Sequence, residues 1–136
     1  HKTVRRQRQM CIRDRKYGLG TTIWSPLASG ALTGKYLDGI PEGSRATLSG
    51  YEWLKKSMVE SDRGQERMGR VTKLAPIAEK LNISMSKLAI AWCLLNKNVS
   101  TVILGASKLE QLKENLESTE VLPLIDEHIQ KELLSI

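Results

Sequence analysis

Two short segments of the sequence carry residue types that bind anions. In the first, Gly105-Ala106-Ser107 follows an apolar run and precedes a helical pattern. A glycine at such a turn lets a ligand approach backbone N–H groups at the positive end of the helix dipole. The alternative is ordinary capping of the helix, because Ser107 and Glu110 have the spacing of a capping box. Spacing alone is compatible with either role.

The second segment, Trp24-Ser25-Pro26-Leu27-Ala28-Ser29-Gly30, directly follows a short β-branched run. Ligands of α/β proteins bind beyond the carboxyl ends of strands, where this segment would lie. Ser25 and Ser29 supply hydroxyl groups, and Lys35 follows within two helical turns with a charge that can neutralise a phosphate. The alternative is a plain strand-to-helix loop with a solvent-facing lysine.

Arg45 lies in a glycine-rich segment that runs from residue 37 to 50. Its guanidinium can hold a phosphate through two parallel hydrogen bonds, or it can be a solvated loop cation. The familiar nucleotide-binding patterns do not match: Gly18-Leu19-Gly20 precedes a strand, and Gly30 to Tyr36 has one residue too few between its glycines for a P-loop. Neither histidine has a partner at ligand spacing, so we expect no metal.

Hydrophobic periodicity and turn residues predict the elements that would position these groups. Two apolar runs predict strands at Gly20–Trp24 and Thr101–Leu104, the second buried on both faces. The remaining pattern predicts helices over Ser29–Tyr36, from Asp62 to Asn82 with a kink at Pro76, over Ser86–Asn96 after a Ser84 cap, after Ser107, and over Asp126–Leu134. The helix over Ser86–Asn96 is apolar on more than one face, which predicts deep burial and makes Cys93 a core thiol.

The order strand, helical crossover, strand, helix, helix is typical of a parallel α/β fold. Two strands alone do not form a stable parallel sheet with covered faces. We therefore expect the sequence to be part of a larger α/β domain.

The basic charge is concentrated at the start of the chain. Residues 1–16 contain seven basic residues and one acid, which accounts for the whole net charge of +6. Residues 17–136 contain fourteen of each sign. A neutral body gives no electrostatic reason to expect nucleic acid or an anionic membrane as a partner.

Composition narrows the class of protein further. The chain has 136 residues, 40% of them hydrophobic, which suits one domain with a packed core. No apolar run approaches the roughly 18 residues of a membrane span, and no apolar signal region is present. The two cysteines, Cys11 and Cys93, suggest neither a disulfide framework nor a zinc site, so we expect a reducing, cytoplasmic setting.

Four motifs in order, "WSPLASGALTGKY", "GIPEGSRA", "LAIAWCLLNKNVSTVILGAS" and "EQLKENL", resemble the C-terminal part of an aldo-keto reductase. The similarity is strongest to the branch that contains potassium-channel beta subunits, and it runs from about Tyr17 to the end. It implies the C-terminal portion of a (β/α)8 barrel, comprising the last two strands and their helices, with residues 17–136 as a partial domain.

The resemblance also implies NADPH as cofactor and aldehydes or ketones as substrates. Carried over by motif, the residues that would line the nicotinamide-to-pyrophosphate stretch are Trp24, Ser25, Pro26, Leu27, Ala28 and Ser29. Lys35 and Arg45 would contact the phosphates, and the adenosine end would be held by Gly105, Ser107, Gln111, Glu114 and Asn115. Gly43 stands where the channel subunits have an aromatic residue, so that stacking contact is absent.

The family's catalytic Asp, Tyr, Lys and His belong to earlier barrel strands, and no residue of this sequence matches them. We therefore expect the chain by itself to be inactive. The alternative implied by the resemblance is a channel-regulatory subunit that binds NADPH, with a channel or further copies of itself as partners. Residues 1–16 resemble translated adapter sequence, and we expect them to be an assembly artefact outside the family domain.

Overall fold

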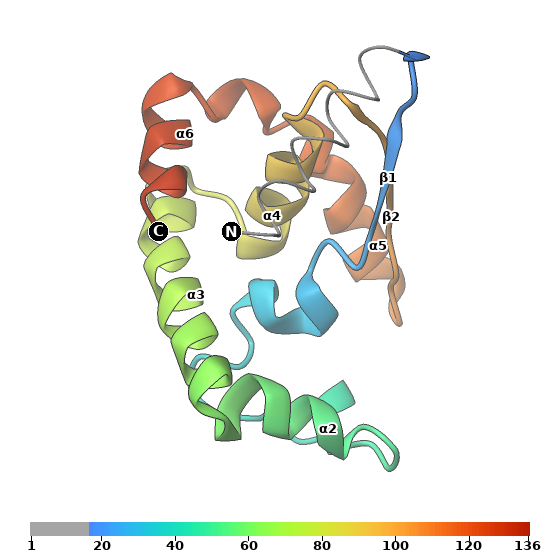
Figure 1. Cartoon of the computed structure of the whole chain (residues 1–136), viewed down its shortest axis with the longest axis vertical. Helices are drawn as coiled ribbons and strands as arrows, with labels where there is room; N and C mark the ends of the chain where they lie inside the picture. Colours follow the sequence, from blue (N-terminus) through green and yellow to red (C-terminus); the bar gives the residue numbers. More distant parts are fainter. Residues whose placement is uncertain (1–16) are drawn as a thin grey trace.

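The computed structural model of the protein describes residues 17–136, in which a two-stranded parallel sheet lies beside a group of helices (Figure 1). Strand β1 spans Thr21–Trp24 and β2 spans Val99–Ile103. Their register pairs Ile23 with Val102 and Trp24 with Ile103. Both predicted strands are confirmed to within two residues, and their parallel pairing confirms a mixed α/β arrangement with a long helical crossover.

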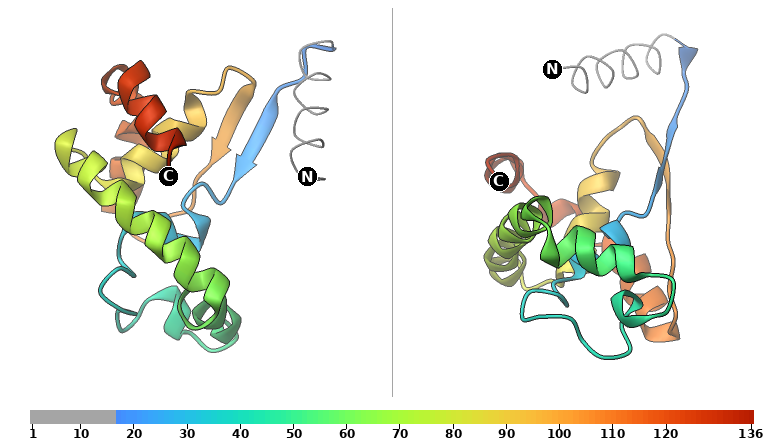
Figure 2. Two further views of the ribbon diagram at one scale, coloured as in Figure 1. Left: turned by 60° about the vertical axis from the view of Figure 1, so that its left-hand side comes forward. Right: turned by 60° about the horizontal axis from the view of Figure 1, so that its bottom comes forward.

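The helices lie to one side of the strand pair, which stands at the margin of the molecule in Figure 2. Helix α4, Met85–Leu94, packs against β2. The expectation that the second strand is buried on both faces is wrong, because Ile103 is 54% exposed. Trp24 of β1 is 80% exposed. Within residues 17–136 the sheet has helices on one side only. The apolar sequence of the second strand therefore did not predict that one of its faces is exposed.

The chain between β1 and the long helix α3, Asp62–Lys80, forms only short helical turns. The helix predicted over Ser29–Tyr36 is instead a pair of 3₁₀ turns, Ala28–Thr33, broken where Ser29 and Gly30 adopt left-handed φ values of 58° and 98°. The following loop contains a 3₁₀ turn at Arg45–Thr47. A short helix α2, Glu52–Lys55, then leads into a π-helical turn at Lys56–Glu60, neither of which the sequence pattern predicted.

Helix α3, Asp62–Lys80, is continuous through Pro76, so the proline does not end the helix. The kink expected there stays a prediction. Val71 and Ile77 are buried on either side of the proline. Asn82 ends it with a left-handed φ of 53°. The Ser84 hydroxyl accepts a hydrogen bond from the Lys87 N–H at 3.2 Å, which confirms the predicted cap of α4.

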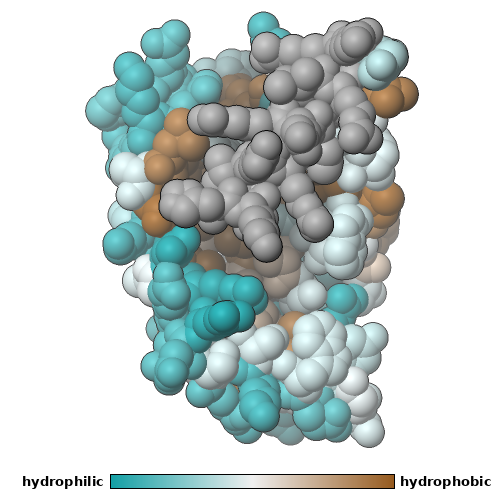
Figure 3. Space-filling view, in the orientation of Figure 1, coloured by the Kyte–Doolittle hydropathy of each residue, from teal (hydrophilic) through white to brown (hydrophobic). Residues whose placement is uncertain are grey.

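The larger core cluster joins α3, α4 and α6, Glu127–Leu134, and its buried members are Ile77, Ala78, Leu88, Ala91, Val121, Ile125 and Ile129. The predicted burial of α4 is confirmed for Leu88 and Ala91 but is wrong for Trp92, which is 37% exposed. A smaller cluster consists of Tyr36, Ala46, Leu54 and Met58. Apolar side chains also reach the surface, as Figure 3 shows over α6.

Helix α5, Leu109–Leu116, begins one residue later than a Ser107 cap requires. Lys108 is its N-terminal boundary and provides no side-chain cap, so the predicted capping box of Ser107 and Glu110 is wrong. The backbone N–H and the hydroxyl of Ser107 both donate to Oε1 of Gln111, each at 3.1 Å. In contrast, Asp126 caps α6, because its Oδ1 accepts from the Ile129 N–H at 2.8 Å.

Candidate functional site

The two candidate segments lie at the same end of the sheet. Trp24 pairs with Ile103 in parallel register, so the chain leaves both strands at one edge. The segment from Ser25 to Gly30 follows β1 there, and Gly105 to Ser107 follow β2 (Figure 1). This juxtaposition is the arrangement in which parallel α/β proteins bind ligands.

The segment after β1 holds a strained backbone. Ser25, Ala28 and Ser29 have φ values of 51°, 47° and 58°, in the left-handed region that favours glycine. Local hydrogen bonds hold this shape: the Ala28 N–H donates to the Ser25 carbonyl at 2.9 Å, and the Ser29 N–H donates to the Ser25 hydroxyl at 3.2 Å. Strained residues of this kind are concentrated at binding and active sites.

Lys35 folds back onto this segment. A Cβ placed on Gly30 would lie 2.9 Å from Lys35 Nζ, so the glycine makes room for the lysine side chain. Thr33 supports the arrangement, because its hydroxyl donates to the Gly30 carbonyl at 2.8 Å and accepts from the Lys35 N–H at 3.4 Å. Sequence analysis missed Thr33. Its signal is a hydroxyl two residues before the lysine, the spacing of a Ser/Thr turn.

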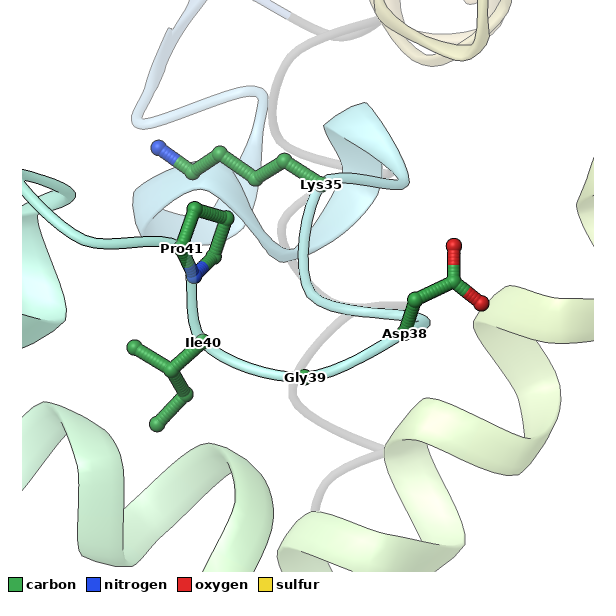
Figure 4. Close-up of a pocket in the computed structure, with 5 residues that line it drawn as sticks. All are labelled: Lys35, Asp38, Gly39, Ile40 and Pro41. Atoms are coloured by element: carbon green, nitrogen blue, oxygen red, sulfur yellow. The ribbon is translucent and has the colours of Figure 1, made fainter.

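A shallow hollow lies beside Lys35 and is completed by Asp38, Gly39, Ile40 and Pro41. Figure 4 shows the Lys35 side chain extending past Pro41, while the Asp38 carboxylate points to the opposite side. No salt bridge within residues 17–136 engages Lys35. Its positive charge is therefore not neutralised by the described acidic side chains.

The segment after β2 is open to approach. A Cβ on Gly105 would meet no heavy atom within 4 Å, and its backbone is not left-handed. Gly105, Ser107 and Gln111 are all exposed, and the two bonds between Ser107 and Gln111 orient their side chains as a pair. These three residues form the accessible part of the segment predicted to hold adenosine.

Glu114 and Asn115 have different surroundings. Lys87 donates to Glu117 at 2.6 Å, and this hydrogen bond, with a smaller electrostatic contribution from Glu114, raises the pKa of Lys87. Glu114 is half-buried near that cation, whereas Asn115 is only 4% exposed. The structure thus turns Asn115 toward the interior and leaves Gln111 on the surface.

Arg45 lies in the 3₁₀ turn next to the smaller core cluster. Its guanidinium carbon is 5.8 Å from the centre of the exposed Tyr51 ring. Tyr36 and Ala46, the neighbours of Lys35 and Arg45 in sequence, belong to that same cluster. The segments that carry the two cations are therefore packed together, although Arg45 is engaged with Tyr51 and Lys35 with the loop after β1.

The predicted residues after β1 differ in exposure. Trp24, Ser25 and Ala28 are exposed, Leu27 and Ser29 are half-buried, and Pro26 is buried. Of the residues predicted to line the nicotinamide side, most are therefore at least partly accessible to a ligand, and Pro26 is the buried one.

Groups capable of metal or thiol chemistry are sparse in the described part of the chain. Residues 17–136 contain no cluster of three His, Cys, Asp or Glu side chains that could hold a metal ion. The thiol of Cys93 is half-buried, and this burial raises its pKa. Among the described helices, none is both long and apolar enough to span a membrane.

A comparison with protein families matches the model of the aldo/keto reductase family over residues 3–132. The chain belongs to the aldo/keto reductase family. The matched range contains both strand-end segments, Lys35, Arg45 and all of α5, so the candidate site lies inside the family domain. It also begins within the basic segment 1–16, which lies outside the described residues.

Proposed function

We propose that this aldo/keto reductase domain binds NADPH at the carboxyl edge of its two strands, for an oxidoreductase that reduces aldehydes or ketones. The observation that supports it most strongly is the approach of Lys35 to the strained loop after β1, at the same sheet edge as the open Gly105. The loop and the glycine turn lie at one sheet edge, so a single extended dinucleotide can contact both.

The residues present fit such a group. Lys35 has no acidic partner within residues 17–136 and supplies the charge that a pyrophosphate requires. The Ser25 hydroxyl accepts from the Ser29 N–H, so its own hydrogen can be donated to a ligand oxygen. Gly105 leaves space for close approach, and the Ser107–Gln111 pair offers polar groups beside it.

When bound, NADPH supplies the hydride for carbonyl reduction. The part of this chain would be to bind and orient that cofactor: the loop from Trp24 to Ser29 at the nicotinamide side, Lys35 and Arg45 at the phosphates, and Gly105, Ser107 and Gln111 at the adenosine. Within this proposal Glu114 is a flanking acid and Asn115 a supporting residue, because its side chain is buried.

An amide-resolved titration tests the proposal on the 136-residue chain. We would add NADPH, then 2′,5′-ADP and nicotinamide mononucleotide as separate probes of its two ends, and follow ¹⁵N–¹H shifts by NMR. We expect 2′,5′-ADP to move the Gly105 and Ser107 amides, and nicotinamide mononucleotide to move those of Ser25 to Gly30.

Charge variants sharpen the test. Lys35→Gln removes the cation beside Gly30 and should weaken NADPH binding about tenfold, the loss of one charge-assisted contact. Lys73→Gln, on the exposed face of α3, changes the net charge equally and should leave affinity unchanged. Equal losses in the two variants, or shifts confined to other regions, would refute binding at this edge.

A further inference from the structure

The guanidinium of Arg45 has an aromatic ring beside it rather than a carboxylate. Its central carbon lies over the Tyr51 ring, 5.8 Å from the ring centre. No salt bridge within residues 17–136 engages Arg45. Glu52, the acid next to Tyr51 in the chain, instead accepts a hydrogen bond from the Gly50 N–H at 3.0 Å. The positive charge of Arg45 therefore has a neighbouring ring but no described acidic partner.

The backbone of both residues is attached to the smaller core cluster. Ala46, next to Arg45, is 5% exposed, and Leu54, three residues after Tyr51, is 2% exposed. The Leu48 N–H donates to the Arg45 carbonyl at 3.3 Å, and the Tyr51 N–H donates to the Leu48 carbonyl at 3.0 Å. These two turns bring the side chains of Arg45 and Tyr51 together.

The pair is open to a ligand from solvent. Arg45 is exposed, and Tyr51 is 38% exposed. The ring of Trp53, which is 57% exposed, has its centre 6.5 Å from that of Tyr51. Tyr36, the neighbour of Lys35 in the chain, belongs to the same core cluster as Ala46. The segment that carries Arg45 thus packs with the segment that carries the other cation proposed to meet phosphate.

An aromatic ring orients a guanidinium without occupying its N–H donors. The attraction comes from the electron-rich face of the ring and requires no hydrogen bond. A carboxylate partner would instead take two of the five donors. The donors stay available in a planar fork that matches a phosphate. Ordering a free arginine side chain on binding costs conformational entropy, and a ring that already orients it reduces this cost.

We propose that Tyr51 is a positioning residue, which holds the Arg45 guanidinium in place to bind a ligand phosphate. The inference rests on the proposed NADPH function for the identity of the natural ligand. Its own requirement is smaller, namely a phosphate group that binds Arg45 and a ring at residue 51. Tyr51 acts through Arg45 and needs no contact of its own with the ligand.

Substitutions at Tyr51 test this role on the 136-residue chain. Tyr51→Leu removes the ring, so the affinity for inorganic pyrophosphate, measured by calorimetry, should fall about threefold, the size of an exposed cation–π contact. Tyr51→Phe keeps the ring and should bind pyrophosphate as the parent does. In an Arg45→Gln background Tyr51→Leu should cause no further loss, because the group that Tyr51 positions is absent. NADPH affinity should follow the same pattern.

Trp53→Leu is the matched control. It removes an exposed aromatic ring from the same segment and leaves Tyr51 beside Arg45. Its affinity for pyrophosphate should equal that of the parent. The Nε–Hε signal of Arg45 in ¹⁵N–¹H NMR gives a second readout. Pyrophosphate at a fixed subsaturating concentration should shift it equally in the parent, Trp53→Leu and Tyr51→Phe, and less in Tyr51→Leu.

Each result decides the proposal. Unchanged pyrophosphate affinity in Tyr51→Leu, an equal loss in Tyr51→Phe or Trp53→Leu, or a further loss in the Arg45→Gln background would overturn the role of Tyr51 and leave NADPH binding by the parent intact. Pyrophosphate binding that depends on the Tyr51 ring, without NADPH binding, would support this role and overturn the proposed function. A parent chain that binds no pyrophosphate would overturn the role of Tyr51, and one that binds no NADPH either would overturn both proposals.

Discussion

Gly105→Ala should change the stability of the protein and its affinity for NADPH in opposite directions. The new Cβ would meet no heavy atom within 4 Å, and the backbone does not require glycine. Replacing glycine at such a position reduces the entropy of the unfolded chain and stabilises a protein by about 0.4–1 kcal/mol. We therefore expect the variant to unfold at a slightly higher temperature, by about 4 °C per kcal/mol.

Ligand binding should change in the opposite direction. The space beside Gly105 is where we propose that the cofactor meets the backbone, so a methyl group there would displace it. A loss of about 1.4 kcal/mol in binding free energy corresponds to a tenfold weaker affinity. Thermal unfolding followed by circular dichroism and NADPH titration by NMR measure the two effects on the same sample.

Gly69→Ala is the control for this experiment. Gly69 lies in the exposed part of α3, and its Cβ would also meet nothing within 4 Å. Alanine is favoured over glycine in a helix interior by about 0.8–1 kcal/mol, so this variant should be stabilised without any change in NADPH affinity. If Gly105→Ala binds NADPH as tightly as the parent does, the proposed approach at Gly105 is wrong.

Three further outcomes follow from the packing. Gly64→Ala would place a Cβ 2.6 Å from the Met58 carbonyl carbon, so the urea midpoint should fall by an amount equivalent to about 1–3 kcal/mol; a midpoint equal to that of Gly69→Ala would contradict the close approach. Ser84→Ala removes the hydroxyl that accepts a hydrogen bond from the Lys87 N–H, and should lower the free energy of unfolding by about 1 kcal/mol in the same assay. An unchanged free energy of unfolding would show that this cap does not stabilise α4. In a Cys11→Ser background, Cys93 should react with a thiol reagent at pH 7.4 more slowly than free cysteine, because burial raises its pKa; an equal rate would refute this.

The sequence predicted elements whose signals are local. The β-branched run between Gly20 and Pro26 became β1, and the hydroxyl of Ser84 caps α4 as its position indicated. In each case the residues that specify the element also form its decisive contacts. Predictions of this kind need no knowledge of the surrounding fold.

Predictions that depended on distant contacts were less successful. The helix expected after β1 is broken by left-handed serine and glycine residues, whose conformation no local pattern specified. Gln111, not Glu110, bonds to Ser107, because α5 begins one residue later than the capping pattern requires. The apolar composition of the second strand predicted two covered faces, but composition does not show which neighbours are present.

The candidate site likewise combines residues that could be predicted from local sequence with contacts that could not. The segments after β1 and β2 and the cation Lys35 could be predicted from residue type and position. The packing of Lys35 against Gly30 and the buried hydroxyl of Tyr36 could not, since both depend on how the loop folds over the smaller cluster.

Helix α5 shows why position in a motif is insufficient to assign a ligand contact. Leu109, Leu112 and Leu116 are spaced along one face and are 61%, 39% and 58% exposed, whereas the polar Asn115 is 4% exposed. The usual amphipathic arrangement is thus reversed within residues 17–136. Ser107 and Gln111 are exposed polar residues that bond to each other at the start of α5. Adenosine binding at this edge should therefore depend on the first turn of α5 rather than on its later residues.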